Sequence, residues 1–258
     1  MEDAVRCVKN WQFNKTLLYQ TRSKLYSHLQ KQHFSSERKY QGFIDSFVNK
    51  FDEDTSKYRR CSVVGNGGIL KNSGCGEEID KADYIFRANL PYISNFSDDV
   101  GKKSNFTTFN PSMIHRRYHN NLDAFKKDLH VYNGYLMFSG PAEDEFVSYV
   151  HKNTKLIDME FEKNYLSAIE HFWESKRFVS VTTGMLMFNL ALTYCEEIHL
   201  FGFWPFTTDV NGNYVPYHYA EDTPKTWIVV VKHSMPSEFL KLKELHVNGV
   251  LRLHIGKC

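Results

Sequence analysis

The pattern of apolar and polar positions divides the chain near residue 60. The first part carries apolar residues at helical spacing: Trp11, Leu18, Leu25 and Leu29. The charged run "FDEDTSKYRR", residues 51–60, is typical of a linker. We therefore expect residues 1–60 to form a helical stem and linker segment, followed by the main domain over residues 61–258.

From residue 61 onward, short apolar runs alternate with helical patterns. The runs that predict strands end near glycine, asparagine or proline: 61–65, 83–90, 105–112, 135–140 and 196–203. The predicted helices are 76–82, 162–176, 183–195 and the stretch that begins near Pro236. Because strands that alternate with helices form parallel sheets, we predict a single α/β domain with a Rossmann-like, mostly parallel sheet flanked by helices. Much of residues 112–155 is interpreted as loops.

Composition excludes some classes of protein. A net charge of +2 and a pI of about 8.2 do not indicate a nucleic-acid binder. No apolar run reaches the roughly 18 residues of a membrane span, and the N-terminus lacks the pattern of a signal peptide. The chain has five cysteines and no CxxC, so their spacing does not indicate zinc, and their number leaves open two disulfides or none. The chain also carries N-glycosylation sequons at Asn14, Asn95 and Asn105.

The stretch "VVGNGG", residues 63–68, predicts a strand that ends in a glycine-rich turn. Such a turn either brings backbone N–H groups to a nucleotide or simply reverses the chain. A dinucleotide fingerprint requires a third glycine, which is missing here, and an acid at the end of the second strand. Asp83 precedes that strand instead, so NAD is a poor fit.

Other polar residues are candidates for chemistry. Thr182 and Thr183 stand where an apolar helix begins, and they form either an anion site or an ordinary N-cap. His218 and His233 flank a loop, where histidine either moves protons or is simply solvated. The "DED" run at 52–54 lies in the charged linker, so we expect no metal site.

Four separated stretches resemble the sialyl motifs of the animal sialyltransferases. "CSVVGNGGILKNSGCGEEIDKADYIFRANLP" resembles the large motif, and "TTGMLMFNLALTYCEEIHLFGFWPF" resembles the small motif. "YHYAED" is similar to the third motif, and "HSMPSEF" to the very small motif. The residues within these motifs are most similar to those of the α2,8 subfamily. The resemblance covers about residues 61–258, which would then be the catalytic domain.

The resemblance implies a glycosyltransferase-A variant of the fold and a reaction. The donor would be CMP-sialic acid, and the acceptor a terminal sialic acid on a glycoprotein or glycolipid, joined in α2,8 linkage with inversion. One phosphate needs no pyrophosphate clamp, so no metal and no cofactor are expected. The Lys and Arg residues of segment 1–60 are scattered among acids and form no dense basic stripe, so we do not expect long polysialylation. The alternatives are an inactive paralogue that binds nucleotide or glycan, and an enzyme of α2,3 or α2,6 linkage.

The resemblance also implies roles for individual residues. The donor-binding set is Asn66, Asn89, Thr182, Thr183, Gly184, Trp204, Tyr217 and His218. In that set Trp204 would wall the nucleotide site, and Tyr217 and His218 would reach the phosphate. His233 would be the general base. Independently of the resemblance, Glu238 lies just past Pro236, where a helix is predicted to begin, and we expect its carboxylate to steady the turn that carries His233.

Two departures from the family pattern bear on activity. The third motif usually reads His-Tyr-Tyr-Asp, whereas this chain has Ala220 and Glu221 at its last two positions. The large motif usually has cysteine where this chain has Ala88. These substitutions motivate the alternative of a weak or inactive enzyme.

The resemblance further implies disulfides and a compartment. It pairs Cys61 with Cys195 and Cys75 with Cys258, and leaves Cys7 spare. The compartment would be the Golgi lumen, which is oxidising. The family's type II membrane anchor is not found in the sequence, so we interpret the chain as a fragment or truncated form whose full-length protein lies in the Golgi membrane. The oligomeric state is left unknown.

Overall fold

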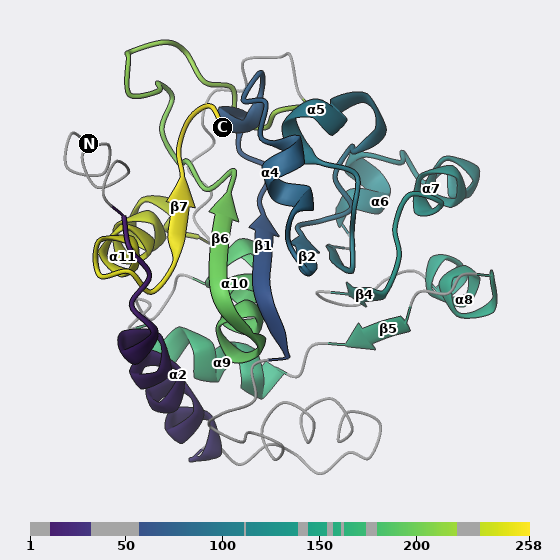
Figure 1. Ribbon diagram of the computed structural model, residues 1–258. Coiled ribbons are helices and arrows are strands. Elements are labelled where there is room, and N and C mark those ends of the chain that lie inside the picture. The colour runs from purple at the N-terminus through teal and green to yellow at the C-terminus, as the bar shows by residue number, and fades with distance from the viewer. Residues whose placement is uncertain are drawn as a thin grey trace.

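The computed structural model describes residues 11–31, 57–110, 112–138, 144–153, 157–160, 163–173, 180–220 and 233–258. Its centre is one seven-stranded sheet (Figure 1). The strands are β1 (Tyr58–Val64), β2 (Tyr84–Arg87), β3 (Phe106–Phe109), β4 (Tyr135–Phe138), β5 (Ile157–Glu160), β6 (Cys195–Phe201) and β7 (Arg252–His254). Every pair of neighbouring strands is parallel, which confirms the predicted α/β class.

The order of the strands creates a switch point in the middle of the sheet. The order is β5-β4-β3-β2-β1-β6-β7, so the chain moves outward from β1 to β5 and then returns to place β6 beside β1. Connections therefore leave β1 and β6 in opposite directions. In open α/β sheets, ligands bind outside the carboxyl ends of the strands at such a point. The loops that follow β1 and β6 are thus the first place to look for a site.

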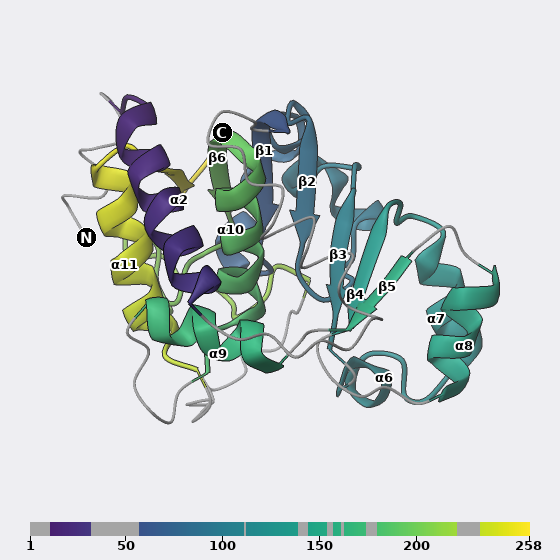
Figure 2. The same cartoon turned by 90° about the horizontal axis from the view of Figure 1, so that it is seen from below.

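Helices cover both faces of the sheet (Figure 2). One face carries α2 (Lys15–Gln30), α9 (Lys163–Phe172), α10 (Thr183–Tyr194) and α11 (Met235–Val247). The other carries α4 (Gly76–Asp80) and α5 (Ser97–Val100), with α7 (Leu122–Leu129) and α8 (Asp144–Asn153) over its outer strands. Side chains of β1 alternate accordingly, because Val63 joins the α10 cluster and Val64 joins the α4 cluster.

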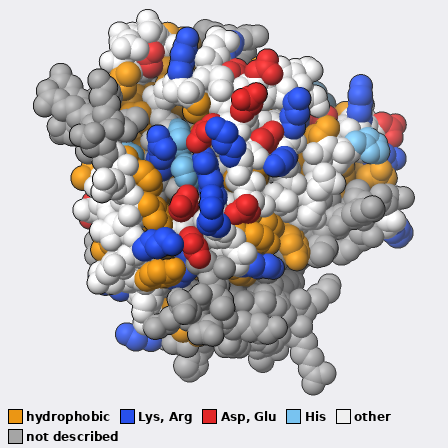
Figure 3. All heavy atoms as spheres, viewed as in Figure 1, with side chains coloured by type: hydrophobic (Ala, Val, Ile, Leu, Met, Phe, Trp, Pro, Cys, Tyr) orange, Lys and Arg blue, Asp and Glu red, His pale blue; other side chains and the backbone are white. Residues whose placement is uncertain are grey.

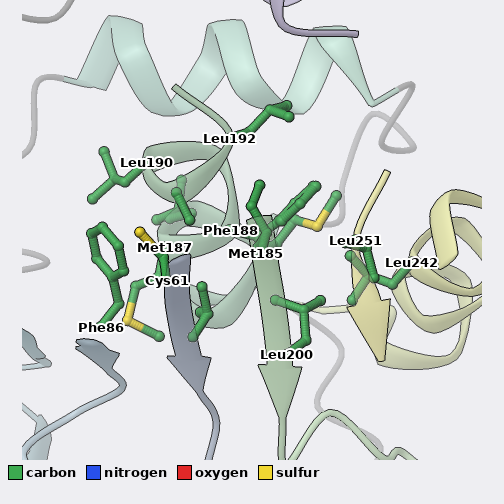
Figure 4. Packing of buried hydrophobic residues seen from close by; sticks show 14 of the residues in the cluster. Cys61, Phe86, Met185, Met187, Phe188, Leu190, Leu192, Leu200, Leu242 and Leu251 are labelled. Atoms are coloured by element: carbon green, nitrogen blue, oxygen red, sulfur yellow. The ribbon is translucent and has the colours of Figure 1, made fainter. Parts of the chain in front are cut away.

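Helix α10 forms the centre of the larger hydrophobic cluster (Figure 4). Every residue from 185 to 192 is buried, because the helix lies between the sheet on one side and α2 and α9 on the other. This explains why its sequence is apolar around its whole circumference. The helix predicted for residues 183–195 is confirmed, and its last predicted residue, Cys195, begins β6.

The interpretation of residues 112–155 as loops was wrong for much of that segment. It contains α6 (Ser112–Arg116), α7 and α8. Asn121 caps α7, since its Oδ1 accepts hydrogen bonds from the amides of Asp123 and Ala124. Phe125 and Leu129 then lie buried on one face of that helix. The helical spacing was present in the sequence, but the helix is short and its mean hydropathy low. The short strand β5 was also missed.

Helix α2 packs as part of the folded body. Leu18, Leu25 and Leu29 are buried in the same cluster as α10, as the predicted apolar stripe requires, although Trp11 precedes the helix. The buried guanidinium of Arg22 donates to the carbonyl oxygens of Leu192 and Cys195, at the end of α10. A cation at a helix C-terminus is favourable because the last carbonyl groups are unpaired. The boundary at residue 60 between stem and catalytic domain stays a prediction.

Candidate functional site

The glycine-rich turn after β1 is packed directly against the loops that follow β6. The amides of Gly65, Gly67 and Gly68 donate to the carbonyl oxygens of Phe201, Gly202 and Tyr217, at 2.8, 3.0 and 3.3 Å.

Glycine is therefore required at these positions because the two loops approach too closely to leave room for a Cβ atom. A Cβ on Gly67 would lie 2.4 Å from the Gly202 oxygen, and one on Gly68 would lie 1.9 Å from the Pro216 oxygen. Their N–H groups are already paired, so they do not form the phosphate cradle that was one interpretation of this turn. What the turn presents instead is the side chain between the glycines, Asn66.

Asn66 is held by both neighbouring loops. Its carbonyl oxygen accepts from the Tyr219 amide at 3.1 Å, and its Nδ2 donates to the Ala88 oxygen at 3.0 Å. Its Oδ1 is buried and has no partner among the described residues. A buried acceptor without a donor is costly. A ligand hydroxyl or amino group at this position would satisfy it.

Asn89 lies in a strained turn after β2. Both Asn89 and Leu90 have positive φ, 57° and 45°. The backbone N–H of Asn89 donates to Thr108 Oγ1 at 2.9 Å. The Thr108 hydroxyl in turn donates to the side-chain Oδ1 of Asn89 at 3.3 Å. Two adjacent non-glycine residues in the left-handed region are unusual, and such strain gathers at functional sites. The turn fixes Asn89 at the carboxyl edge of the sheet.

The N-terminus of α10 is clasped by Glu238 from α11. The Thr182 amide and Thr182 Oγ1 donate to the two carboxylate oxygens of Glu238, both at 2.6 Å. Thr182 Oγ1 also accepts from the Met185 amide at 3.2 Å, which makes it the N-cap. Its single hydroxyl proton is engaged by Glu238, and contact between Thr182 and a donor stays a prediction. The amides of Thr183 and Gly184 remain for an anion at the helix N-terminus.

The hydrogen bonds of the Glu238 carboxylate go to Thr182, whereas its position past Pro236 had suggested that it steadies the turn of His233. Burial raises the pKa of the Glu238 carboxyl, and the hydrogen bonds from Thr182 and the nearby His233 act in the opposite direction. Because both oxygens accept hydrogen bonds, the geometry is that of a carboxylate. Sequence spacing placed Glu238 near the site, but its partner lies 56 residues away and left no local signal.

His233 is oriented by a backbone carbonyl. Its Nδ1 lies 2.7 Å from the carbonyl oxygen of Ser180. A carbonyl only accepts, so Nδ1 carries the proton, and in the neutral ring the lone pair is on Nε2. Ser180 in turn donates its hydroxyl to Glu170 Oε1 at 2.5 Å. The imidazole is therefore held beside the N-terminus of α10 with its basic nitrogen turned away from the supporting carbonyl.

Tyr217 and His218 lie next to the glycine-rich turn. His218 forms an isolated antiparallel bridge with Gly67, and the rings of Tyr217 and His218 are 4.3 Å apart. The Tyr217 hydroxyl lies 3.9 Å from the sulfur of Met235, at the start of α11. This segment thus joins the turn after β1 to the helix that follows His233.

Trp204 occupies the interior beneath the site. Its side chain is buried, packs edge-to-face on Phe206 and Phe239, and donates its indole N–H to the Thr208 oxygen at 2.9 Å. Phe203 is the aromatic residue that lies against Gly184, where a Cβ would be 2.8 Å from the ring. Contact between Trp204 and a donor stays a prediction.

Backbone and side-chain contacts join all the predicted site residues at one edge of the sheet. The turn at Asn66 contacts the segment of His218, Phe203 contacts Gly184, and the α10 terminus contacts Glu238. Their assigned roles stay predictions. Ala220 is half-buried beside the α4 cluster, and Glu221 lies outside the described residues.

The structure contains both implied disulfides. Cys61 of β1 bonds to Cys195 of β6, and Cys75 bonds to Cys258. The first joins the two strands that flank the switch point, and the second ties the C-terminus to the loop before α4. Cys7 lies outside the described residues.

The predicted glycosylation sites differ in accessibility. Asn14 and Asn95 are exposed, and Asn14 caps α2. Asn105 is half-buried, and its Oδ1 accepts from the Ile85 amide at 2.9 Å. Glycosylation at each of these positions stays a prediction.

Within the described part of the chain, no cluster of three or more His, Cys, Asp or Glu is arranged to hold a metal ion. No helix in that same part combines the length and apolarity that a membrane crossing requires. On the face seen in Figure 3, Lys and Arg are interspersed with Asp and Glu rather than gathered in a stripe of one sign.

The asparagine turns and the N-terminus of α10 lie near the switch point, where open α/β sheets bind ligands. The chain belongs to glycosyltransferase family 29, the sialyltransferases, which matches residues 7–250. It is 38% identical over 227 residues to an alpha-N-acetylneuraminide alpha-2,8-sialyltransferase of Xenopus tropicalis, a match over 81% of this chain and 65% of the relative. It is 39% identical over 222 residues to alpha-2,8-sialyltransferase 8E of Rattus norvegicus, covering 79% of this chain and 57% of the relative. The chain thus spans less than two thirds of these relatives.

Solved structures support the fold. The crystal structure of a mammalian sialyltransferase superposes with a TM-score of 0.55 at 20% identity, covering 97% of this chain and 88% of the other. A second, in complex with Gal-beta-1-3GalNAc-ortho-nitrophenol, gives a TM-score of 0.54 at 19% identity, over 96% and 89% of the two chains. At this level of identity the likeness concerns the fold alone.

Proposed function

We propose that the protein transfers sialic acid from CMP-sialic acid to a terminal sialic acid on a glycoprotein or glycolipid glycan, in α2,8 linkage and with inversion. The observation that carries this proposal is the fixed tautomer of His233, with Nδ1 bonded to the Ser180 carbonyl beside the N-terminus of α10. A base next to an anion site is what displacement of a phosphate leaving group requires. The names of the relatives favour α2,8 over the α2,3 and α2,6 alternatives.

The donor would bind along the carboxyl edge near β1 and β6. The unpartnered Oδ1 of Asn66 would accept from the nucleotide, and Asn89 would donate its side-chain amide. The amides of Thr183 and Gly184, with the positive end of the α10 dipole, would hold the anionic group. Tyr217 and His218 would approach the phosphate.

In the reaction, Nε2 of His233 removes the proton from the acceptor 8-hydroxyl as its oxygen attacks the anomeric carbon. The bond from that carbon to the phosphate oxygen breaks, and CMP leaves with the bonding electrons. Attack and departure on opposite faces invert the anomeric centre. Helix N-terminal amides stabilise the charge that develops on the leaving phosphate.

We propose that the reaction needs no metal. CMP-sialic acid presents a single phosphodiester, and helix amides and His218 supply the compensating groups. Transfer should therefore persist in EDTA at close to its untreated rate. Loss of activity in EDTA and its recovery with Mn²⁺ would contradict this part of the proposal.

The decisive experiment is release of CMP from CMP-sialic acid with a panel of sialylated acceptors, followed by linkage analysis of the product. An α2,8-linked product supports the proposal, and an α2,3- or α2,6-linked product replaces it with the other linkage. No CMP release with any acceptor favours the inactive paralogue that Ala220 and Glu221 motivate.

We place the protein in the Golgi lumen. Two disulfides and two exposed sequon asparagines are consistent with an oxidising compartment where N-glycans are attached. Localisation of the tagged full-length protein against Golgi and cytosolic markers tests this, and a cytosolic distribution would contradict it.

A further inference from the structure

Tyr92 presents an exposed aromatic ring at the edge of the candidate site. It follows the strained turn at Asn89 and Leu90, at the carboxyl edge of the sheet. The residues on either side of this ring are fixed, because Leu90 and Ile93 are buried, whereas Tyr92 itself is 45% exposed. An isolated exposed tyrosine needs no explanation, but one held rigidly beside a site does.

Three separate contacts hold the backbone and the ring of Tyr92. The Tyr219 hydroxyl donates to the Tyr92 carbonyl oxygen at 2.6 Å, and the Tyr132 hydroxyl donates to the oxygen of Pro91. The Arg117 guanidinium carbon lies 3.8 Å from the centre of the Tyr92 ring. One face of the ring is thus covered by a cation.

Arg117 is itself anchored. Its side chain is 6% exposed and its Nη2 lies 2.5 Å from Asp128 Oδ2. Its Nε is buried and has no partner among the described residues. The Tyr92 ring therefore packs on a guanidinium that Asp128 holds in place, and the Nε–H of that guanidinium has no hydrogen-bond acceptor among the described residues. A ligand that stacks on this ring pays little entropy to order it.

We propose that Tyr92 is the platform on which the acceptor stacks, and that the occupant is the pyranose ring of the acceptor's sialylated terminus. This rests on the proposed function. The groups assigned to the donor lie at the ends of β1, β2 and β6 and at the start of α10, whereas Tyr92 follows Asn89 by three residues and lies against Arg117, from the segment after α6. Aromatic rings offer the apolar surface that a sugar ring's C–H face requires. Because Arg117 is paired with Asp128, it fixes the ring, and the acidic character of the stacked sugar follows from the proposed function.

The test compares Tyr92→Leu and Tyr92→Phe with a matched control. The Tyr92 carbonyl belongs to the backbone, so both variants retain the bond from Tyr219. Tyr135→Leu is the control, because Tyr135 is 38% exposed but begins β4 and so lies at the opposite, amino edge of the sheet. Steady-state kinetics are measured with CMP-sialic acid and α2,3-sialyllactose.

Tyr92→Leu should raise the acceptor KM about tenfold, as expected for loss of one aromatic stacking contact. The donor KM and the slow release of CMP without acceptor should stay unchanged, and Tyr92→Phe and Tyr135→Leu should match the wild type. A rise in the donor KM would place the nucleotide on this ring and overturn the proposal. An unchanged acceptor KM would overturn it equally.

Failure of the platform and failure of the proposed function are distinguishable. If the wild type releases no CMP, binding of sialyllactose is followed by saturation-transfer NMR on the wild type and Tyr92→Leu. Loss of the sialic acid signals in Tyr92→Leu alone supports a glycan platform on an inactive protein. Equal signals in both proteins, or none in either, would overturn it.

Discussion

Glu238 of α11 and Thr182 at the start of α10 are joined by two hydrogen bonds of 2.6 Å, one from the Thr182 amide and one from its hydroxyl. His233 lies five residues before Glu238 and is held by Ser180, two residues before Thr182. The segment that carries the proposed base and the helix that carries the proposed anion site are therefore one unit. Loss of the Glu238–Thr182 contact or of the His233–Ser180 contact should therefore disturb both the proposed base and the proposed anion site.

The first prediction concerns the carboxylate of this clasp. Glu238→Gln replaces two charge-assisted acceptors with one amide oxygen and one donor, which leaves a Thr182 donor unpaired. We expect a loss of about 1 to 3 kcal/mol in the free energy of unfolding. We also expect a higher KM for CMP-sialic acid, because the α10 N-terminus loses its fixed position. Urea unfolding and donor kinetics measure the two effects.

Glu244→Gln is the matched control for this variant. Glu244 lies on the same helix and pairs with Lys241 at 3.2 Å on the exposed side, where an ion pair contributes about 0 to 1 kcal/mol. Thr182→Val should reproduce part of the Glu238→Gln effect, and the double variant should show that the two effects are not additive. Additive effects, or a donor KM within twofold of wild type, would mean that the clasp does not position the site.

Local sequence patterns predicted the elements better than the contacts between them. The apolar run from Met185 to Leu192 predicted α10, and the run at 61–65 predicted the end of β1. The order of the strands was not predicted, because the step that returns the chain from β5 to β6 has no local signal. The glycines of the first turn suggested a phosphate contact, whereas their amides are used by carbonyl groups across the switch point.

The site was predicted mainly through the resemblance. From the sequence alone, His233 was either a residue that moves protons or a solvated histidine. Thr182 was either part of an anion site or an ordinary N-cap. The structure adds the hydrogen-bond partner that orients each residue: Ser180 for His233, and Glu238 for Thr182. Tyr92 was not predicted at all, since its exposure and its support by Tyr219 and Arg117 arise only from the fold.

The second prediction separates the base from its support. In His233→Asn, the side-chain amide can still donate to the Ser180 carbonyl, but it cannot accept a proton at the position of Nε2. We expect kcat to fall by about 10² to 10⁴, with affinity for CMP retained. His218→Ala should instead raise the donor KM. Turnover and CMP titration distinguish these outcomes, and a His233→Asn enzyme that keeps more than about a tenth of wild-type kcat would exclude His233 as the base.

The third prediction concerns the disulfide that closes the C-terminus. Cys75 and Cys258 are 183 residues apart, and the chain-entropy model gives such a bridge about 5 kcal/mol. Cys258→Ser should lower Tm strongly, and dithiothreitol should then lower it less than it lowers the wild type. Cys7→Ser is the control, since Cys7 takes part in neither bridge. A Cys258→Ser protein with unchanged Tm would show that the bridge does not form in solution.

The last prediction is a dependence of stability on pH that originates in a pair of histidines on neighbouring strands. His199 of β6 and His254 of β7 face each other, with Nδ1 of the first 3.0 Å from Nε2 of the second. Burial lowers the pKa of His199 to about 3, and the cations of Arg60 and Arg252 act in the same direction. Burial lowers the pKa of His254 to about 2, and the neighbouring His199 and Arg252 lower it further. Glu78 opposes the shift, but less strongly.

Both histidines are therefore neutral in the folded protein at pH values where the unfolded chain binds protons. In the unfolded state a histidine has a pKa of about 6.5, so the stability that depends on this pair is complete above about pH 6.5. It declines as the pH falls from 6.5 toward 3, by at most about 1.4 kcal/mol per pH unit for each histidine. His199→Gln combined with His254→Gln should flatten the pH dependence of the urea midpoint in this range. His130→Gln, which removes an exposed histidine at the end of α7, should not. A double variant with the same slope as wild type between pH 4 and 6.5 would show that other groups govern the acid sensitivity of the fold.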